Sequence, residues 1–219
     1  MFKRINSFVN KHKLKVIKPF TGKSEYVTFS ICGRTSKISS ALLEEFVEID
    51  QVEIVEGDIF ALNCTALVSP ANSFGDMSGG LDKIIDNFYQ NKAQTMVIKT
   101  IQSDFFGELP VGNAIIINMK TNKFSNLIVS PTMRIPGNIE GTINVYLAMR
   151  ALLVALAKYN SHTVNKIQTI AIPSLGTGIG GMNAKESARQ MKTAFKNIVL
   201  NGWREIKHPA MAPYVTNLS

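Results

Sequence analysis

The stretch IPSLGTGIGGMNAKE, residues 172–186, joins the apolar run QTIAI to a segment with helical spacing. Its Gly176, Gly178 and Gly181 satisfy the pattern G-x-G-x-x-G, and glycines in a strand-to-helix turn let the backbone approach a phosphate without Cβ clashes. Successive N–H groups of such a loop can form a nest for an anion, and the following helix adds the positive end of its dipole. The pattern alone is equally compatible with a tight turn that binds nothing.

The position of this loop in the chain argues against a nicotinamide-dependent oxidoreductase. In that class the glycine pattern opens the fold, and an acidic residue about 20 positions later binds the ribose. Here too little chain follows the loop for a second strand–helix–strand unit, and Glu205 lies in NGWREIKHP, which does not resemble a buried strand. The loop is therefore either a turn without a ligand or the site of a phosphate ligand of another kind.

Short apolar segments alternate along the chain with segments of helical periodicity. The expected strands cover residues 26–32, 51–56, 65–70, 113–119, 126–131 and 168–173. The expected helices cover residues 36–49, 81–90, 92–105, 142–159 and 183–200. This alternation predicts an α/β fold with helices on both faces of a sheet, and ligands of such folds bind beyond the carboxyl ends of the strands. Three loops follow expected strands there, namely GDIF, ANSFGDMSGG and SLGTGIGG.

The length of 219 residues and a hydrophobic content of 45% fit one domain with its own core. We expect a basic lead-in over residues 1–25, the α/β domain over 26–205, and a surface tail over 206–219. Cys32 and Cys64 match no metal or redox spacing, and no apolar run is long enough to span a bilayer. These features indicate a soluble, cytoplasmic protein without a disulfide framework.

The net charge of +8 is concentrated near the N-terminus. A basic balance favours anionic partners such as nucleotides or nucleic acid. A solvated basic segment that aids solubility explains the charge equally well, because no aromatic-interleaved RNA-binding motif accompanies it.

Four short motifs follow one another in order: GDI (57–59), AN (71–72), GGLD (79–82) and PSLGTGIG (173–180). In order and spacing this series resembles the macrodomain family, over roughly residues 51–200. The resemblance implies a three-layer α/β/α fold with a central mixed β-sheet. It also implies binding of ADP-ribose or a related compound, without a cofactor or a metal.

The resemblance also implies a role for each motif. Asp58, beside Ile59, would accept a hydrogen bond from the adenine amino group, since a carboxylate can only accept; a turn cap is the alternative. Asp82 would orient water near the anomeric carbon. Its alternative role is structural, as a carboxylate in the first turn of a helix, where the helix dipole stabilises negative charge. The pyrophosphate and distal-ribose contacts would come from Ser174, Gly176, Thr177, Gly178, Ile179, Gly180, Ala71, Asn72, Gly79 and Gly80.

This chain departs from the family pattern at several positions. Ser69 replaces the first Asn of the usual NAAN, and the loop SFGDMSGG holds the bulky Phe74 where glycines are usual. The aromatic residue that many members place after the late glycine loop is absent, and Phe74 either replaces that ring or belongs to the core. Arg134, between two prolines in SPTMRIP, suits either an extra terminal phosphate, as in ADP-ribose 1″-phosphate, or a surface salt bridge.

The sequence leaves three functions open. The first is hydrolysis at the distal ribose of an ADP-ribosyl linkage or of ADP-ribose 1″-phosphate, with Asn72 and Asp82 as catalytic residues. The second is a non-catalytic reader that binds ADP-ribose-type signals. The third is nucleic-acid binding through the basic N-terminal segment. No nucleophilic triad or metal-ligand cluster points to another chemistry.

Overall fold

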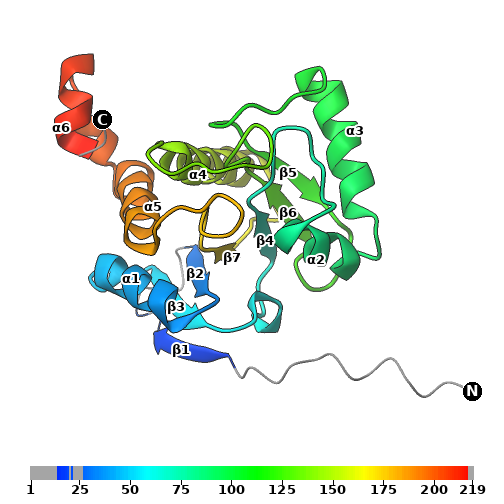
Figure 1. The fold of residues 1–219 in the computed structure, drawn as a ribbon, viewed down its shortest axis with the longest axis horizontal. Helices are drawn as coiled ribbons and strands as arrows, with labels where there is room; N and C mark the ends of the chain where they lie inside the picture. Colours follow the sequence, from blue (N-terminus) through cyan, green and yellow to red (C-terminus); the bar gives the residue numbers. More distant parts are fainter. Residues whose placement is uncertain (1–13, 20, 22–26, 217–219) are drawn as a thin grey trace, which may run out of the picture.

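The computed structural model describes residues 14–19, 21 and 27–216. Seven strands within these residues form one sheet in the order β1-β3-β2-β7-β4-β6-β5 (Figure 1). Their bounds are β1 Lys15–Lys18, β2 Thr28–Gly33, β3 Val52–Glu56, β4 Ala66–Ser69, β5 Ile115–Asn118, β6 Asn126–Val129 and β7 Thr169–Pro173. The neighbouring strands from β3 to β6 run parallel, whereas β1 and β5 pair antiparallel at the two edges. The expected α/β fold with a central mixed sheet is confirmed.

Helices cover both faces of the sheet. Their bounds are α1 Ser36–Phe46, α2 Gly80–Phe88, α3 Ala93–Phe105, α4 Asn144–His162 and α5 Ala184–Ile198. Buried residues of α1, α4 and α5 share one apolar cluster, and those of α2 and α3 share the other. Figure 1 shows these two groups on opposite sides of the strands. None of the helices in the described residues is long and apolar enough to cross a membrane.

Three aromatic rings from different elements pack together in the larger core. Phe195 of α5 is fully buried, and its ring meets Phe29 of β2 edge-on at 5.0 Å between centroids and Phe46 of α1 at 6.0 Å. Edge-to-face packing adds to the free energy gained by burying such rings. These contacts fix α1 and α5 against the same side of the sheet.

The first strand was not expected from the sequence, because the basic lead-in shows no apolar alternation. β1 pairs with β3, and Lys18 is buried. Its Nζ donates to the carbonyls of Ile49 at 2.7 Å and Val52 at 2.6 Å, and burial lowers the pKa of this lysine. A lysine of the lead-in therefore serves the fold. The basic residues before Leu14, on which the nucleic-acid hypothesis depends, lie outside the described residues.

The C-terminal segment forms three short helical turns, η2 Gly202–Glu205, η3 Pro209–Met211 and α6 Ala212–Thr216, after α5. In the expected surface tail, most described side chains are exposed, and Thr216 is buried. In Figure 1, α6 lies at the margin of the molecule, away from the sheet.

Candidate functional site

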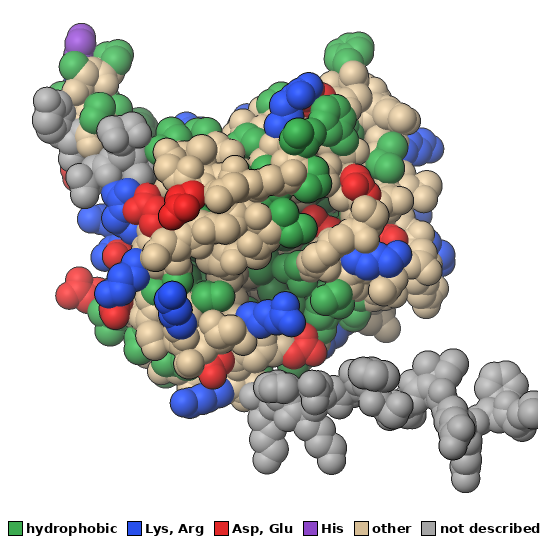
Figure 2. All heavy atoms as spheres, in the orientation of Figure 1, with side chains coloured by type: hydrophobic (Ala, Val, Ile, Leu, Met, Phe, Trp, Pro, Cys, Tyr) green, Lys and Arg blue, Asp and Glu red, His purple; other side chains and the backbone are tan. Residues whose placement is uncertain are grey.

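The polar loops that follow the parallel strands meet at one edge of the sheet. β3, β7, β4 and β6 are parallel neighbours or near neighbours, so their carboxyl ends lie together. We call residues 70–80, after β4, the first glycine loop and residues 174–182, after β7, the second glycine loop. Figure 2 shows that this face of the molecule is hollowed near its middle.

The second glycine loop is held by hydrogen bonds from its own backbone and from a neighbouring loop. The Met182 N–H donates to the carbonyl of Gly176 at 3.0 Å, and the Gly181 N–H donates to Gly178 at 3.0 Å. From outside, the Ile139 N–H donates to the carbonyl of Gly180 at 2.9 Å. The carbonyls of Gly176, Gly178 and Gly180 therefore already accept hydrogen bonds from the protein.

The N–H groups of Gly178, Ile179 and Gly180 are different. Within the described residues they donate no hydrogen bond to the protein. Gly180 is buried, and a buried N–H without any partner is costly, so such groups are normally satisfied by water or a ligand. Three consecutive free donors form the kind of nest that accepts phosphate oxygens.

Glycine is found at the positions of this loop for two different reasons. Gly176 has φ +72°, and a Cβ there would lie 2.6 Å from Val145 Cγ2. A Cβ at Gly180 would lie 2.7 Å from the Gly176 carbonyl oxygen. A Cβ at Gly178, by contrast, would meet no protein atom within 4 Å. The fold requires glycine at positions 176 and 180, whereas the space beside Gly178 is open to a ligand.

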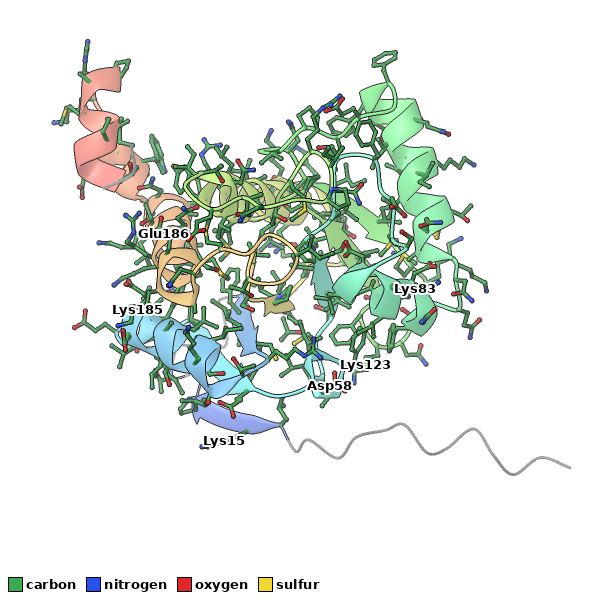
Figure 3. All side chains as sticks on the ribbon, in the orientation of Figure 1. Lys15, Asp58, Lys83, Lys123, Lys185 and Glu186 are labelled. Carbon is green, nitrogen blue, oxygen red and sulfur yellow. The ribbon has the colours of Figure 1, made fainter. Side chains whose placement is uncertain are left out.

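Asp58 stands at the end of β3 and is exposed. Its Oδ1 accepts a hydrogen bond from the Phe60 N–H at 3.0 Å and so caps the turn η1, Ile59–Ala61. Its other oxygen accepts no hydrogen bond within the described residues. Lys123 donates to the carbonyl of Phe60 in the same turn and lies near Asp58 (Figure 3). The capping role is therefore present, and one carboxylate oxygen is still available to a ligand.

Other residues that the sequence assigned to the site contribute through fold rather than exposed side chains. Ile59 and Ala71 are buried in the core. The hydroxyls of Ser174 and Thr177 lie 2.9 Å apart, and Thr177 also donates to the carbonyl of Ser174 at 3.1 Å. These contacts brace the start of the second glycine loop.

Asn72 is buried and organises the first glycine loop. Its Oδ1 accepts from the N–H groups of Phe74 at 3.1 Å and Asp76 at 3.3 Å, and its Nδ2 donates to the Asp76 carbonyl at 2.7 Å. One N–H of the Asn72 amide is left for any other partner. The structure thus gives this residue a loop-shaping role, and its predicted contact with a ribose stays a prediction.

Asp82 lies in the first turn of α2, where its Oδ1 accepts from the Ser69 hydroxyl at 2.7 Å. Burial raises the pKa of Asp82 to about 6, the Ser69 bond opposes that rise, and the negative charge of Asp76 adds to it. Ser69, which replaces the usual asparagine, is therefore the residue that positions this carboxylate. A carboxyl group with a pKa near neutrality suits proton transfer.

The two glycine loops touch each other through Ile179. A Cβ on Gly80, which has φ +58°, would lie 3.4 Å from Ile179 Cδ1. Gly79, just before it, would meet nothing within 4 Å. The predicted residues Gly79, Gly80 and Ile179 therefore do come together, and Asp82 follows them on α2.

The guanidinium of Arg134 is engaged in an ion pair. Its Nε and Nη2 donate to the two carboxylate oxygens of Glu108 at 2.7 and 3.0 Å, and its guanidinium lies 5.3 Å from the Phe74 ring centroid. This bond holds the pKa of Glu108 below its usual range. Of the two roles weighed for Arg134, the structure displays the surface salt bridge, and a phosphate contact stays a prediction.

Two groups near the glycine loops were missed by sequence reasoning. Thr35 and Ile38, at the start of α1, line a space of about 350 Å³ together with Thr177 and Met182. The topology alone brings β2 and α1 beside β7, so no local motif could reveal this contact. The second group is Asp76. The sequence could have revealed it, because a charged residue is unusual in a loop that is usually glycine-rich.

The sequence of the chain matches known proteins over the segment that carries these loops. The model of the Macro domain family matches residues 68–191. An uncharacterized protein of Aquifex aeolicus is 29% identical over 140 residues, which cover 64% of this chain and 78% of that protein.

Solved structures show the same fold. The Oceanobacillus iheyensis macrodomain with ADP superposes with a TM-score of 0.57 at 21% identity, covering 68% of this chain and 76% of that one. Thermosipho africanus DarTG in complex with ADP-ribose gives a TM-score of 0.54 at 16% identity, covering 76% of this chain and 50% of that one. The fold and its loops define a three-layer α/β/α class of macrodomain type. The chain belongs to the macro domain family.

The raised pKa of Asp82 predicts a pH dependence of stability. The pKa of Asp82 in the folded protein, about 6, lies above its usual value of 3.8. The contribution of Asp82 to the free energy of unfolding is therefore full below about pH 4 and is lost as the pH rises through 6. Replacing Asp82→Asn should remove that loss, worth about 2–3 kcal/mol for such a shift. Urea unfolding should show that the free energy of unfolding of Asp82→Asn rises relative to that of the wild type as the pH increases from 4 to 7. A difference independent of pH, or an equal gain in the exposed control Asp104→Asn, would contradict the assignment.

Proposed function

We propose that this macrodomain binds ADP-ribose or a close derivative in the hollow between its two glycine loops. The observation that carries the proposal is the set of free N–H groups at Gly178, Ile179 and Gly180. Their geometry suits the oxygens of a diphosphate. The start of α5 lies immediately beyond, where a helix dipole favours negative charge. The ADP and ADP-ribose present in the two structures named above support the same ligand class.

The orientation that we propose for the ligand follows the polar groups of the site. The adenine end lies at Asp58, whose free carboxylate oxygen accepts from the exocyclic amino group. The diphosphate lies on the second glycine loop. The distal ribose then reaches the first glycine loop, near Gly79 and Asp82.

We further propose slow hydrolysis at the anomeric carbon of the distal ribose. Asp82, largely ionised at pH 7, takes a proton from a water molecule. The water oxygen bonds to the anomeric carbon while the bond from that carbon to the leaving group breaks. The leaving group takes a proton from solvent, so the products are ADP-ribose and the protonated leaving group. In this scheme Ser69 acts only by positioning the Asp82 carboxylate.

A non-catalytic reader of ADP-ribose is the second candidate function. The observation that favours it is the state of Asn72, whose amide is engaged almost entirely by Phe74 and Asp76 in its own loop. A residue so engaged has little capacity to orient a substrate. Both candidates use the same contacts for adenine and diphosphate, so turnover measurements separate them.

The adenine contact predicts a selective effect of Asp58→Asn. The asparagine oxygen can still cap the Phe60 N–H, but its amino group cannot accept from adenine. ADP-ribose should therefore bind more weakly by about 1.5–3 kcal/mol, the range for a hydrogen bond to a charged group. Calorimetry on wild type, Asp58→Asn and the control Asp50→Asn measures this. Unchanged affinity in folded Asp58→Asn would exclude this place for the adenine.

The open space beside Gly178 predicts that Gly178→Glu folds but does not bind. Its Cβ meets no protein atom, while its carboxylate would occupy and repel the diphosphate, with an expected loss of affinity of about 100-fold or more. Gly137→Glu adds the same charge to a neighbouring loop and serves as the control. Thermal unfolding verifies the fold, and titration with ADP-ribose measures affinity. Normal binding by Gly178→Glu would disprove the proposed diphosphate site.

Catalysis predicts that Asp82→Ala lowers turnover by about 10²–10⁴-fold, the usual contribution of positioned proton transfer. ADP-ribose affinity should change little, since Asp82 acts mainly in the transition state. Release of ADP-ribose from a mono-ADP-ribosylated protein, measured beside calorimetry on the same two proteins, provides both values. Wild type that binds ADP-ribose but turns over neither this substrate nor ADP-ribose 1″-phosphate would leave the reader as the function.

A further inference from the structure

The distal end of the cleft is acidic. Asp76 and Asp82 both belong to the segment that joins β4 to α2, and each has its own serine partner. The Asp82 carboxylate accepts from Ser69 at 2.7 Å, and the Asp76 carboxylate accepts from the N–H and hydroxyl of Ser78 at 2.9 and 3.0 Å. The two carboxylates are close enough for the charge of Asp76 to raise the pKa of Asp82. Two negative charges that share one site repel each other.

Asp76 cannot easily turn away from this position. The amide of the buried Asn72 accepts from the Asp76 N–H and donates to the Asp76 carbonyl, so it grips both sides of that residue's backbone. The Met77 side chain is buried, and its N–H donates to Gln94 of α3 at 2.8 Å. These bonds fix the backbone of Asp76 four residues before α2 begins, and Ser78 holds its solvent-exposed carboxylate.

The cations nearby do not offset this charge. Arg134 spends its guanidinium on a bidentate ion pair with Glu108. Lys83 follows Asp82 on α2, but one residue along a helix turns the side chain by about 100°, and Lys83 is exposed to solvent. In Figure 3 it is seen on α2, apart from Asp58 at the other end of the site. The positive end of α2 is already matched by Asp82 in its first turn.

We infer that the distal end selects ADP-ribose whose anomeric carbon carries hydroxyl or an uncharged substituent, and that it rejects a terminal 1″-phosphate. Asp76 is the residue that sets this selectivity. The inference rests on the proposed ADP-ribose site and narrows its substrate class to ADP-ribosyl linkages with a neutral leaving group. A terminal phosphate would bring up to two negative charges at pH 7 against two carboxylates, while Arg134, the arginine that contacts Phe74 of this loop, is already paired with Glu108.

The test compares two ligands on the full chain. Calorimetry with ADP-ribose and with ADP-ribose 1″-phosphate should show at least about tenfold tighter binding of ADP-ribose by wild type, since one additional charge repulsion in the cleft is worth that much. Asp76→Asn keeps an oxygen for the Ser78 N–H while removing the charge. It should reduce the ratio of the two affinities by about 3- to 10-fold and change ADP-ribose affinity less than twofold.

Asp104→Asn is the matched control, because Asp104 also accepts from a neighbouring serine, Ser103, and lies on α3. It should leave the ratio unchanged. A second measurement needs no variant. Raising the salt from about 0.02 to 0.5 M should shrink the wild-type ratio, because salt screens the repulsion.

The outcomes separate the inference from the function on which it rests. Wild type that binds neither ligand overturns the proposed ADP-ribose site itself. Wild type that binds ADP-ribose 1″-phosphate as tightly as ADP-ribose, or more tightly, overturns the inference and leaves the site standing. A ratio that is unaffected by salt and by Asp76→Asn overturns the role of Asp76.

Discussion

Gly176 sets the shape of the second glycine loop through its left-handed backbone. With φ at +72°, the chain reverses so that Met182 donates back to the Gly176 carbonyl, while Ile139 takes the carbonyl of Gly180. The carbonyls of both glycines then accept from the protein, and the N–H groups of Gly178, Ile179 and Gly180 donate to no group among the described residues. No side chain could sit at position 176, because Val145 and Ile139 of the core already fill that space. The packing of Val145, on α4, and of Ile139 against Gly176 therefore fixes the conformation of the loop.

The polar groups of the cleft follow a simple order of charge. Free N–H donors occupy its middle, at the second glycine loop, and carboxylates occupy both ends. Asp58 lies at one end and Asp82 at the other. Such an arrangement suits a ligand that is anionic in its centre and carries hydrogen-bond donors at its extremities. ADP-ribose has this pattern, with a diphosphate between an aminopurine and a ribose that carries hydroxyl groups.

The first glycine loop shows how a changed sequence keeps a site by other contacts. Ser69 is shorter than asparagine, yet its hydroxyl still reaches Asp82. Phe74 is bulkier than glycine, and its exposed ring supports Arg134, which Glu108 holds in place. Phe74 therefore places an ion-paired arginine against a loop in which glycines are usual.

The elements of the fold could be predicted from the sequence because their signals are local. Alternation and helical spacing located the strands from β2 to β7 and the helices from α1 to α5. The parallel order of the strands then required that loops after β3, β4 and β7 meet, so the motifs at Asp58, Gly79 and Gly178 could be assigned to one cleft. The resemblance to macrodomains added the ligand class.

Only the tertiary structure decided which partner each polar group takes. Lys18 satisfies the carbonyls of Ile49, before β3, and of Val52, the first residue of β3, so part of the basic lead-in is tied to the sheet as an edge strand. Arg134 pairs with Glu108, 26 residues away. Asn72 spends its amide on its own loop, and Ser69 meets Asp82 across a 13-residue separation. Periodicity depends on neighbours along the chain, whereas hydrogen-bond partners and the pKa values that follow from them depend on packing between distant segments.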